Sequence, residues 1–73
     1  MDAQTLEATL RMHLTEMRTR LERALGIAKT ADAAAETGNI DKALEIALDI
    51  EPLIYEVNTF LNAASMIHRT HKP

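Results

Sequence analysis

Cysteine is absent from this chain of 73 residues, so no disulfide can stabilise the fold. A domain of this size buries too little surface for a comfortable margin of stability unless something else holds it together. Without cysteine, the chain also offers no Cys and His cluster at the spacing of a structural zinc site. Oligomerisation or unusually close helix packing must supply the missing stability, and we predict oligomerisation.

Long apolar stretches are also missing. No stretch approaches the ~20 apolar residues that a membrane-spanning helix needs. The N-terminal residues lack the charged-then-apolar plan of a signal peptide, and the lack of cysteine fits a reducing compartment. These absences predict a soluble cytoplasmic protein that does not enter a membrane.

Glycine and proline occur only twice each, and no proline interrupts the first half of the chain. Apolar residues recur there at a mean spacing close to 3.6, which is typical of one face of a helix. This expected inner face comprises Leu6, Leu10, Leu14, Met17, Leu21, Ala24, Ala28, Ala31 and Ala35. Because Asp2 can cap the start, we predict one helix over residues 3–36.

Thr37, Gly38 and Asn39 form the clearest interruption. Glycine suits the left-handed position just past a helix end, and either Asn39 or Asp41 can cap a following helix. A connection this short forces two helices to lie side by side and antiparallel. We therefore predict a single all-α domain, an antiparallel helical hairpin with its turn at 37–39 and its second helix over residues 40–69.

Pro52 lies inside this second helix, where it removes a backbone donor and clashes with the carbonyl of Leu48. The apolar spacing nevertheless continues from Ile50 to Ile54, so we predict a continuous helix kinked at Pro52. The alternative is a break, which would place Pro52 in the first turn of a third helix and Glu51 near its N-terminus.

Two rows of apolar residues run along the second helix, and together they are wider than one neighbouring helix can cover. Two hairpins can cover both rows, so we predict a homodimeric four-helix bundle. The expected interface, with a second copy or with another protein, comprises Ile46, Leu53, Ile54, Val57, Phe60, Leu61 and Ile67. A strip of Leu44, Leu48 and Tyr55 flanks it and is either part of this surface or the edge of the core.

Charge is unevenly distributed along the chain, although the net charge is only −3. Residues 30–56 carry one basic and seven acidic side chains, a net charge of −6, and the last residues turn basic through Arg69 and Lys72. Opposite charges attract, weakly where they are exposed. We therefore predict an antiparallel dimer in which each basic tail lies near the acidic turn of the other copy.

Residues 9–29 carry five basic and two acidic side chains, a net charge of +3. Arg11, Arg18 and Lys29 are candidates for a nucleic-acid face, and an RNA-binding hairpin dimer is the alternative function. Acidic partners at helical spacing favour a solvated surface instead. The expected ion pairs are Glu7 with Arg11, Glu16 with Arg20, Arg18 with Glu22, and Lys29 with Asp32.

The segment Gly38-Asn39-Ile40-Asp41-Lys42-Ala43-Leu44-Glu45 through Pro52 resembles the second helix of a tetratricopeptide repeat, a family of helix-pair adaptors. Ala31 and Ala43 occupy positions where that family has small residues. The family's aromatic positions hold Ile27, Ala34 and Ala47 here, and no second copy of the repeat is present. The chain departs too far from the repeat pattern for us to assign it to that family.

The histidines are the remaining candidate metal ligands. His13 stands three residues from Glu16, and His68 three from His71, a spacing that can point two side chains at one metal ion. The facing positions of the second helix are apolar, so a metal-binding bundle is the least favoured alternative, and we expect no cofactor. No nucleophile–base pair or phosphate-cradling glycine loop is present. We predict a small interaction or regulatory protein and no enzyme.

Overall fold

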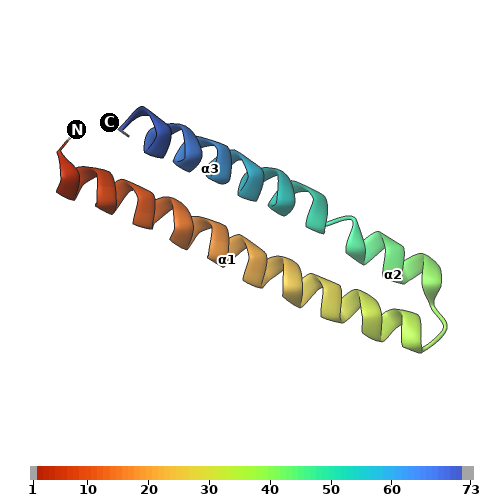
Figure 1. The fold of residues 1–73 in the computed structure, drawn as a ribbon. Coiled ribbons are helices and arrows are strands. Elements are labelled where there is room, and N and C mark those ends of the chain that lie inside the picture. Colours follow the sequence, from red (N-terminus) through yellow and green to blue (C-terminus); the bar gives the residue numbers. More distant parts are fainter. Residues whose placement is uncertain (1, 72–73) are drawn as a thin grey trace.

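The computed structural model describes residues 2–71. Three helices make up this part of the chain, α1 (Ala3–Glu36), α2 (Ile40–Ala47) and α3 (Ile50–Thr70). Figure 1 shows α1 along one side and α2 and α3 in succession along the other, with both ends of the chain at the same end of the molecule. The all-α antiparallel hairpin is confirmed. It measures 55 × 15 × 14 Å, and none of its described helices is both long and apolar enough to cross a membrane.

Side chains cap the helix ends at the predicted places. The Asp2 carboxylate accepts a hydrogen bond of 2.7 Å from the backbone N–H of Thr5 at the start of α1, and that bond lowers the pKa of Asp2. After α1, Gly38 has a φ of 88°, the left-handed conformation that L side chains rarely adopt. The Asn39 side chain then accepts from the backbone N–H of Lys42 at 3.3 Å and caps α2.

The predicted continuous second helix is wrong, because it divides at Leu48 and Asp49 into α2 and α3. Pro52 is the third residue of α3, and its ring would clash with the Leu48 carbonyl in an unbroken helix. That carbonyl instead accepts from the N–H of Glu51 at 3.1 Å, three residues on. Leu48 and Asp49 keep right-handed helical dihedrals, which is why the apolar spacing runs through the break.

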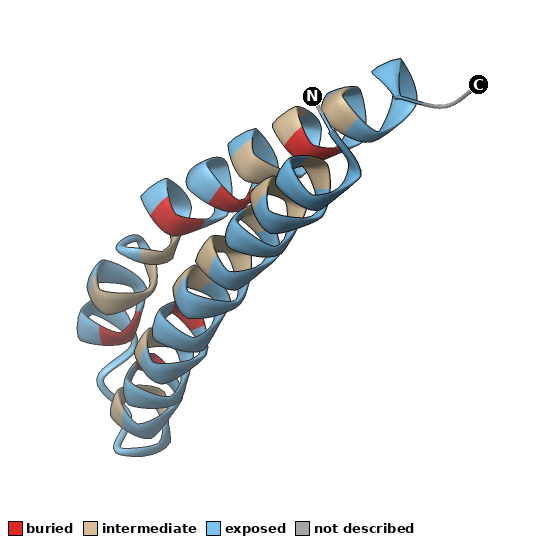
Figure 2. Cartoon of the chain, turned by 90° about the vertical axis from the view of Figure 1, so that its left-hand side faces the viewer, coloured by how far each residue is buried: buried red, intermediate tan, exposed pale blue. Residues whose placement is uncertain are grey.

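The core of the single chain is thin. Its buried side chains are Ala24, Ala31, Ala43, Leu53, Val57 and Ala64, and Figure 2 shows buried residues on the sides where the helices face each other. Four of the six are alanine, which lets the helix axes approach closely. Only Leu53 and Val57 are larger, so the hairpin buries little apolar surface on its own.

The predicted inner face of α1 is rotated from the observed one. Leu14 and Leu21 are 58% and 46% exposed, and Ala28 is exposed as well. His13, Arg20 and other residues one position earlier take the half-buried places beside α3. Polar residues with long or aromatic side chains can occupy such places through their apolar parts, so counting only apolar residues shifted the predicted face.

The close approach of α1 to α2 gives a testable expectation. Ala31 is buried between them, so Ala31→Leu should lower the free energy of unfolding by about 1–3 kcal/mol, because there is no room for the added carbons. Ala33→Leu, which makes the same change at an exposed position of the same helix, should stay within about 0.5 kcal/mol of the natural chain. Urea titration followed by circular dichroism measures both. Equal effects would mean that the helices do not pack closely here.

Candidate protein-interaction face

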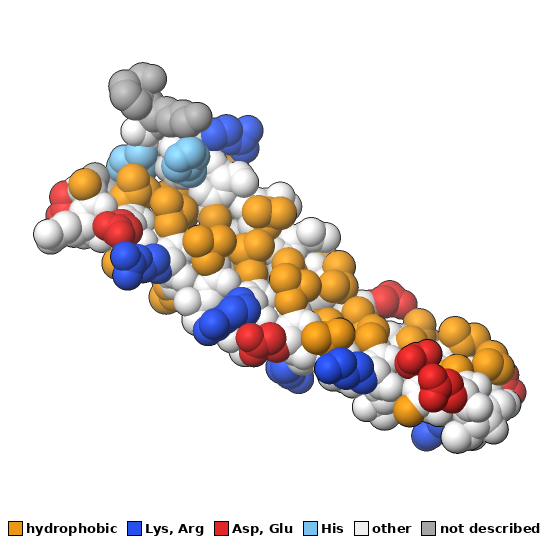
Figure 3. Space-filling model, turned by 60° about the horizontal axis from the view of Figure 1, so that its bottom comes forward, with side chains coloured by type: hydrophobic (Ala, Val, Ile, Leu, Met, Phe, Trp, Pro, Cys, Tyr) orange, Lys and Arg blue, Asp and Glu red, His pale blue; other side chains and the backbone are white. Residues whose placement is uncertain are grey.

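One long side of the hairpin presents large hydrophobic side chains to solvent. We call this the apolar face, and it consists of Leu14, Leu21, Leu44, Leu48, Ile54 and Leu61, each of which is exposed. Figure 3 shows hydrophobic side chains gathered in a band along the length of the molecule, with Lys and Arg side chains at its edge. Contiguous apolar surface of this extent is uncommon on monomers and typically marks an interaction site.

Two shallow grooves lie on this face, and the first of them is lined by both antiparallel halves of the hairpin. At the open end, Leu10 and Leu14 of α1 share a groove with Ala64, Ser65 and His68 of α3. Leu61 lies one helical turn before Ser65 and two before His68, so it belongs to the same side of α3. The apolar face therefore spans the two antiparallel halves of the hairpin.

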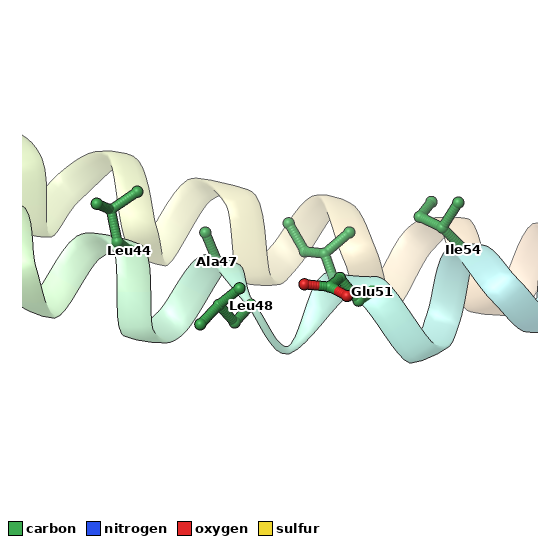
Figure 4. Close-up of a pocket in the computed structure, with 6 residues that line it drawn as sticks. Leu44, Ala47, Leu48, Glu51 and Ile54 are labelled. Carbon is green, nitrogen blue, oxygen red and sulfur yellow. The ribbon is translucent and has the colours of Figure 1, made fainter.

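The second and larger groove lies where α2 gives way to α3. It has a volume of about 640 Å³ and is lined by Leu44, Ala47, Leu48, Ile50, Glu51 and Ile54. In Figure 4, Leu44 and Ile54 lie at its two ends, with Leu48 and Glu51 between them. All the lining side chains except Glu51 are apolar, so the groove suits an apolar side chain of a partner.

The opposite side of the hairpin is polar and centres on Arg20. Its guanidinium donates hydrogen bonds to the carboxylates of Glu16 at 2.7 Å and Glu56 at 2.9 Å, and the bond to Glu16 raises the pKa of Arg20. The same group lies 4.7 Å from the ring centroid of Phe60, and the His13 ring meets Phe60 edge-on at 5.6 Å. The predicted Glu16–Arg20 pair is confirmed, and Arg20 also ties α1 to α3.

The structure distributes the predicted interface residues over two environments. Leu53 and Val57 are buried against α1 within the single chain, and Ile46, Phe60 and Ile67 are half-buried. These residues therefore belong mainly to the fold of one chain. Ile54, Leu61, Leu48 and Tyr55 are exposed, and the first three lie on the apolar face.

The sequence pattern does not assign Leu14 or Leu21 to an interface, and it includes Leu44 only in the strip with Leu48 and Tyr55. Leu14 and Leu21 were placed on the inner face of the first helix, although they are exposed in the single chain. Their spacing of seven residues repeats in Ile54 and Leu61, and that shared spacing is a signal that could have identified an outward stripe on each half of the hairpin.

The candidate nucleic-acid residues form one exposed row along α1, since their spacings of seven and eleven residues return to the same side of a helix. Arg11 pairs with Glu7 at 2.8 Å and Arg18 with Glu22 at 3.8 Å. Within residues 2–71, Lys29 forms no ion pair, so the predicted contact with Asp32 is absent. Two of the three cations are thus partly neutralised where a phosphate would have to bind.

The histidines do not come together. The Nδ1 of His13 donates a hydrogen bond of 2.8 Å to the Thr9 carbonyl, while His68 and His71 lie near the end of α3. Among the described residues, no three His, Asp or Glu side chains are grouped so that they could hold a metal ion.

Comparison with known proteins does not indicate a function. No protein-family model matches this chain, and no curated protein or solved structure is significantly similar to it. Its function must therefore be inferred from its own surfaces, of which the apolar face is the most distinctive.

Proposed function

We propose that this chain is a small protein-interaction or regulatory module that acts by association rather than by catalysis, as a homodimeric four-helix bundle joined through the apolar face. The observation that carries the proposal is the imbalance between exposed and buried apolar side chains. Eleven large hydrophobic side chains are exposed in the described chain, whereas the only buried side chains larger than alanine are Leu53 and Val57. A chain of this size gains stability most readily by burying such a surface against a partner.

The size of the face supports a stable interface. A side of the hairpin 55 Å long and 15 Å wide has an area of about 800 Å², which matches the roughly 800 Å² that each partner buries in a typical stable complex. A second copy presents an identical surface, and such a self-complementary contact closes after two chains. The bundle that results buries the apolar rows of both hairpins between four helices.

Light scattering coupled to size exclusion tests the proposal. We expect a species of twice the 8.1 kDa chain mass at micromolar concentration, with a helix content that falls as dilution dissociates it. A fully helical species of single-chain mass at that concentration would contradict the proposal, because the apolar face would then remain in water without loss of the fold.

A further inference from the structure

Two seven-residue series on the apolar face run from large side chains at the open end of the hairpin to alanine near its turn. At successive seven-residue steps α1 presents Leu14, Leu21 and Ala28, and the other half presents Leu61, Ile54 and Ala47. The ion pair between Arg20 and Glu56 sets the middle members of the two series at nearly the same height. Within these two series the large side chains lie at the open end and in the middle. Ala28 and Ala47 lie nearer the turn, where Leu44 and Leu48 flank Ala47.

The groove at the α2–α3 break is a consequence of this change in side-chain size. Ala47 leaves space between Leu44 and Leu48, and the resulting hollow of about 640 Å³ opens onto the apolar face (Figure 4). Stable interfaces are packed as closely as protein interiors. A hollow of this kind therefore requires a large side chain from the other copy.

We infer that the second copy lies antiparallel on the apolar face, so that its open end fills the groove of the first; this inference rests on the proposed homodimer. A twofold axis near Leu21 and Ile54 sets Leu61 of one copy over Ala47 of the other, because each is seven residues from Ile54. In a parallel dimer Ala28 would meet Ala47, and the groove would stay empty.

The charges favour the same arrangement. The turn end of the hairpin carries four acidic side chains, Asp32, Glu36, Asp41 and Glu45, and a parallel dimer would bring two such sets together. In the antiparallel dimer Arg69 of one copy approaches Asp41 of the other, since they lie fifteen and thirteen residues from Ile54 on opposite sides. Lys72, the other basic residue predicted for this contact, lies outside the described residues. Exposed pairs are individually weak, so they set orientation rather than strength.

Distances between spin labels test the orientation, and the natural absence of cysteine allows a single labelled site. In Asn39→Cys the label sits at the turn, about sixteen residues of helix from the twofold axis. At a rise of 1.5 Å per residue, the two labels of an antiparallel dimer should be about 50 Å apart in pulsed electron resonance. A distance of about 20 Å or less would overturn the antiparallel arrangement, because the two turns would then lie together.

Asn58→Cys is the matched control, since it is exposed on α3 only four residues from Ile54. Its labels should be less than about 30 Å apart in either orientation, because they lie close to the middle of the dimer. A short distance at both sites therefore refutes the orientation while leaving the homodimer intact. If neither site shows coupling and light scattering finds only single chains, the proposed homodimer fails, and the inferred orientation fails with it.

Discussion

Ile54→Asp should convert the dimer into single chains. Ile54 lies at the centre of the apolar face and next to the inferred twofold axis, so the substitution places two carboxylates close together in an apolar interface. Burying an unpaired carboxylate costs several kcal/mol. A loss of about 3 kcal/mol of association free energy already raises the dissociation constant more than a hundredfold. Light scattering at micromolar concentration should report the mass of one chain.

The same variant should also lose helix content on heating at a lower temperature than the natural chain. Ile54 is 40% exposed in the single hairpin, so the substitution does little damage inside one chain. It removes the stabilisation that association supplies to a thin core. The melting temperature of the natural chain should fall on dilution, and that of Ile54→Asp should stay nearly constant.

Met66→Asp is the matched control because it introduces the same charge at an exposed apolar position of the same helix. Met66 lies fourteen residues after Pro52, two heptads along one side of α3. Pro52 lines the polar side of the hairpin together with Arg23, Asp49 and Glu56. Met66→Asp should therefore remain dimeric. Loss of the dimer in both variants, or in neither, would show that the apolar face is not the interface.

Local chemistry made much of the fold predictable. The Asp2 cap, the left-handed glycine and the Asn39 cap depend on neighbours within a few residues, and the sequence predicts a first helix over residues 3–36 where α1 spans Ala3–Glu36. The hairpin follows from the short turn alone. Such features need no knowledge of what the helices pack against.

The break before Pro52 was harder to predict, because the residues that form it remain almost helical. The N–H groups of Asp49 and Glu51 bond to carbonyls three residues back instead of four, a difference that shifts the apolar pattern too little to interrupt it. The sequence predicts the clash of Pro52 with the Leu48 carbonyl, but periodicity does not say whether a helix bends or divides in response.

The assignment of apolar rows to inside and outside was the least predictable step. Arg20 and His13 occupy half-buried positions because Phe60 accepts the guanidinium on its face and the imidazole at its edge. A count of apolar residues cannot anticipate such a contact, so it favoured Leu14 and Leu21 for the inside. The apolar face therefore became evident only from three-dimensional packing.

Leu53→Ala should be the most destabilising truncation within the single chain. Leu53 is 5% exposed and is the larger of the two buried side chains that exceed alanine. Removing it should lower the free energy of unfolding by about 2–5 kcal/mol, since the surrounding helices relax only partly around the cavity that is left. Stabilities of whole domains are typically about 5–15 kcal/mol, so the variant should be partly unfolded near 37 °C.

Tyr55→Ala provides the comparison, because Tyr55 is 74% exposed two residues further along α3 and its truncation should change stability by no more than about 0.5 kcal/mol. Urea denaturation at several protein concentrations separates the two possible roles of Leu53. If Leu53 supports the single hairpin, the difference from the natural chain should be the same at every concentration, and the folded fraction should still dimerise. A difference that disappears on dilution would instead place Leu53 at the contact between copies, as its seven-residue row with Ile46, Phe60 and Ile67 predicts from sequence alone.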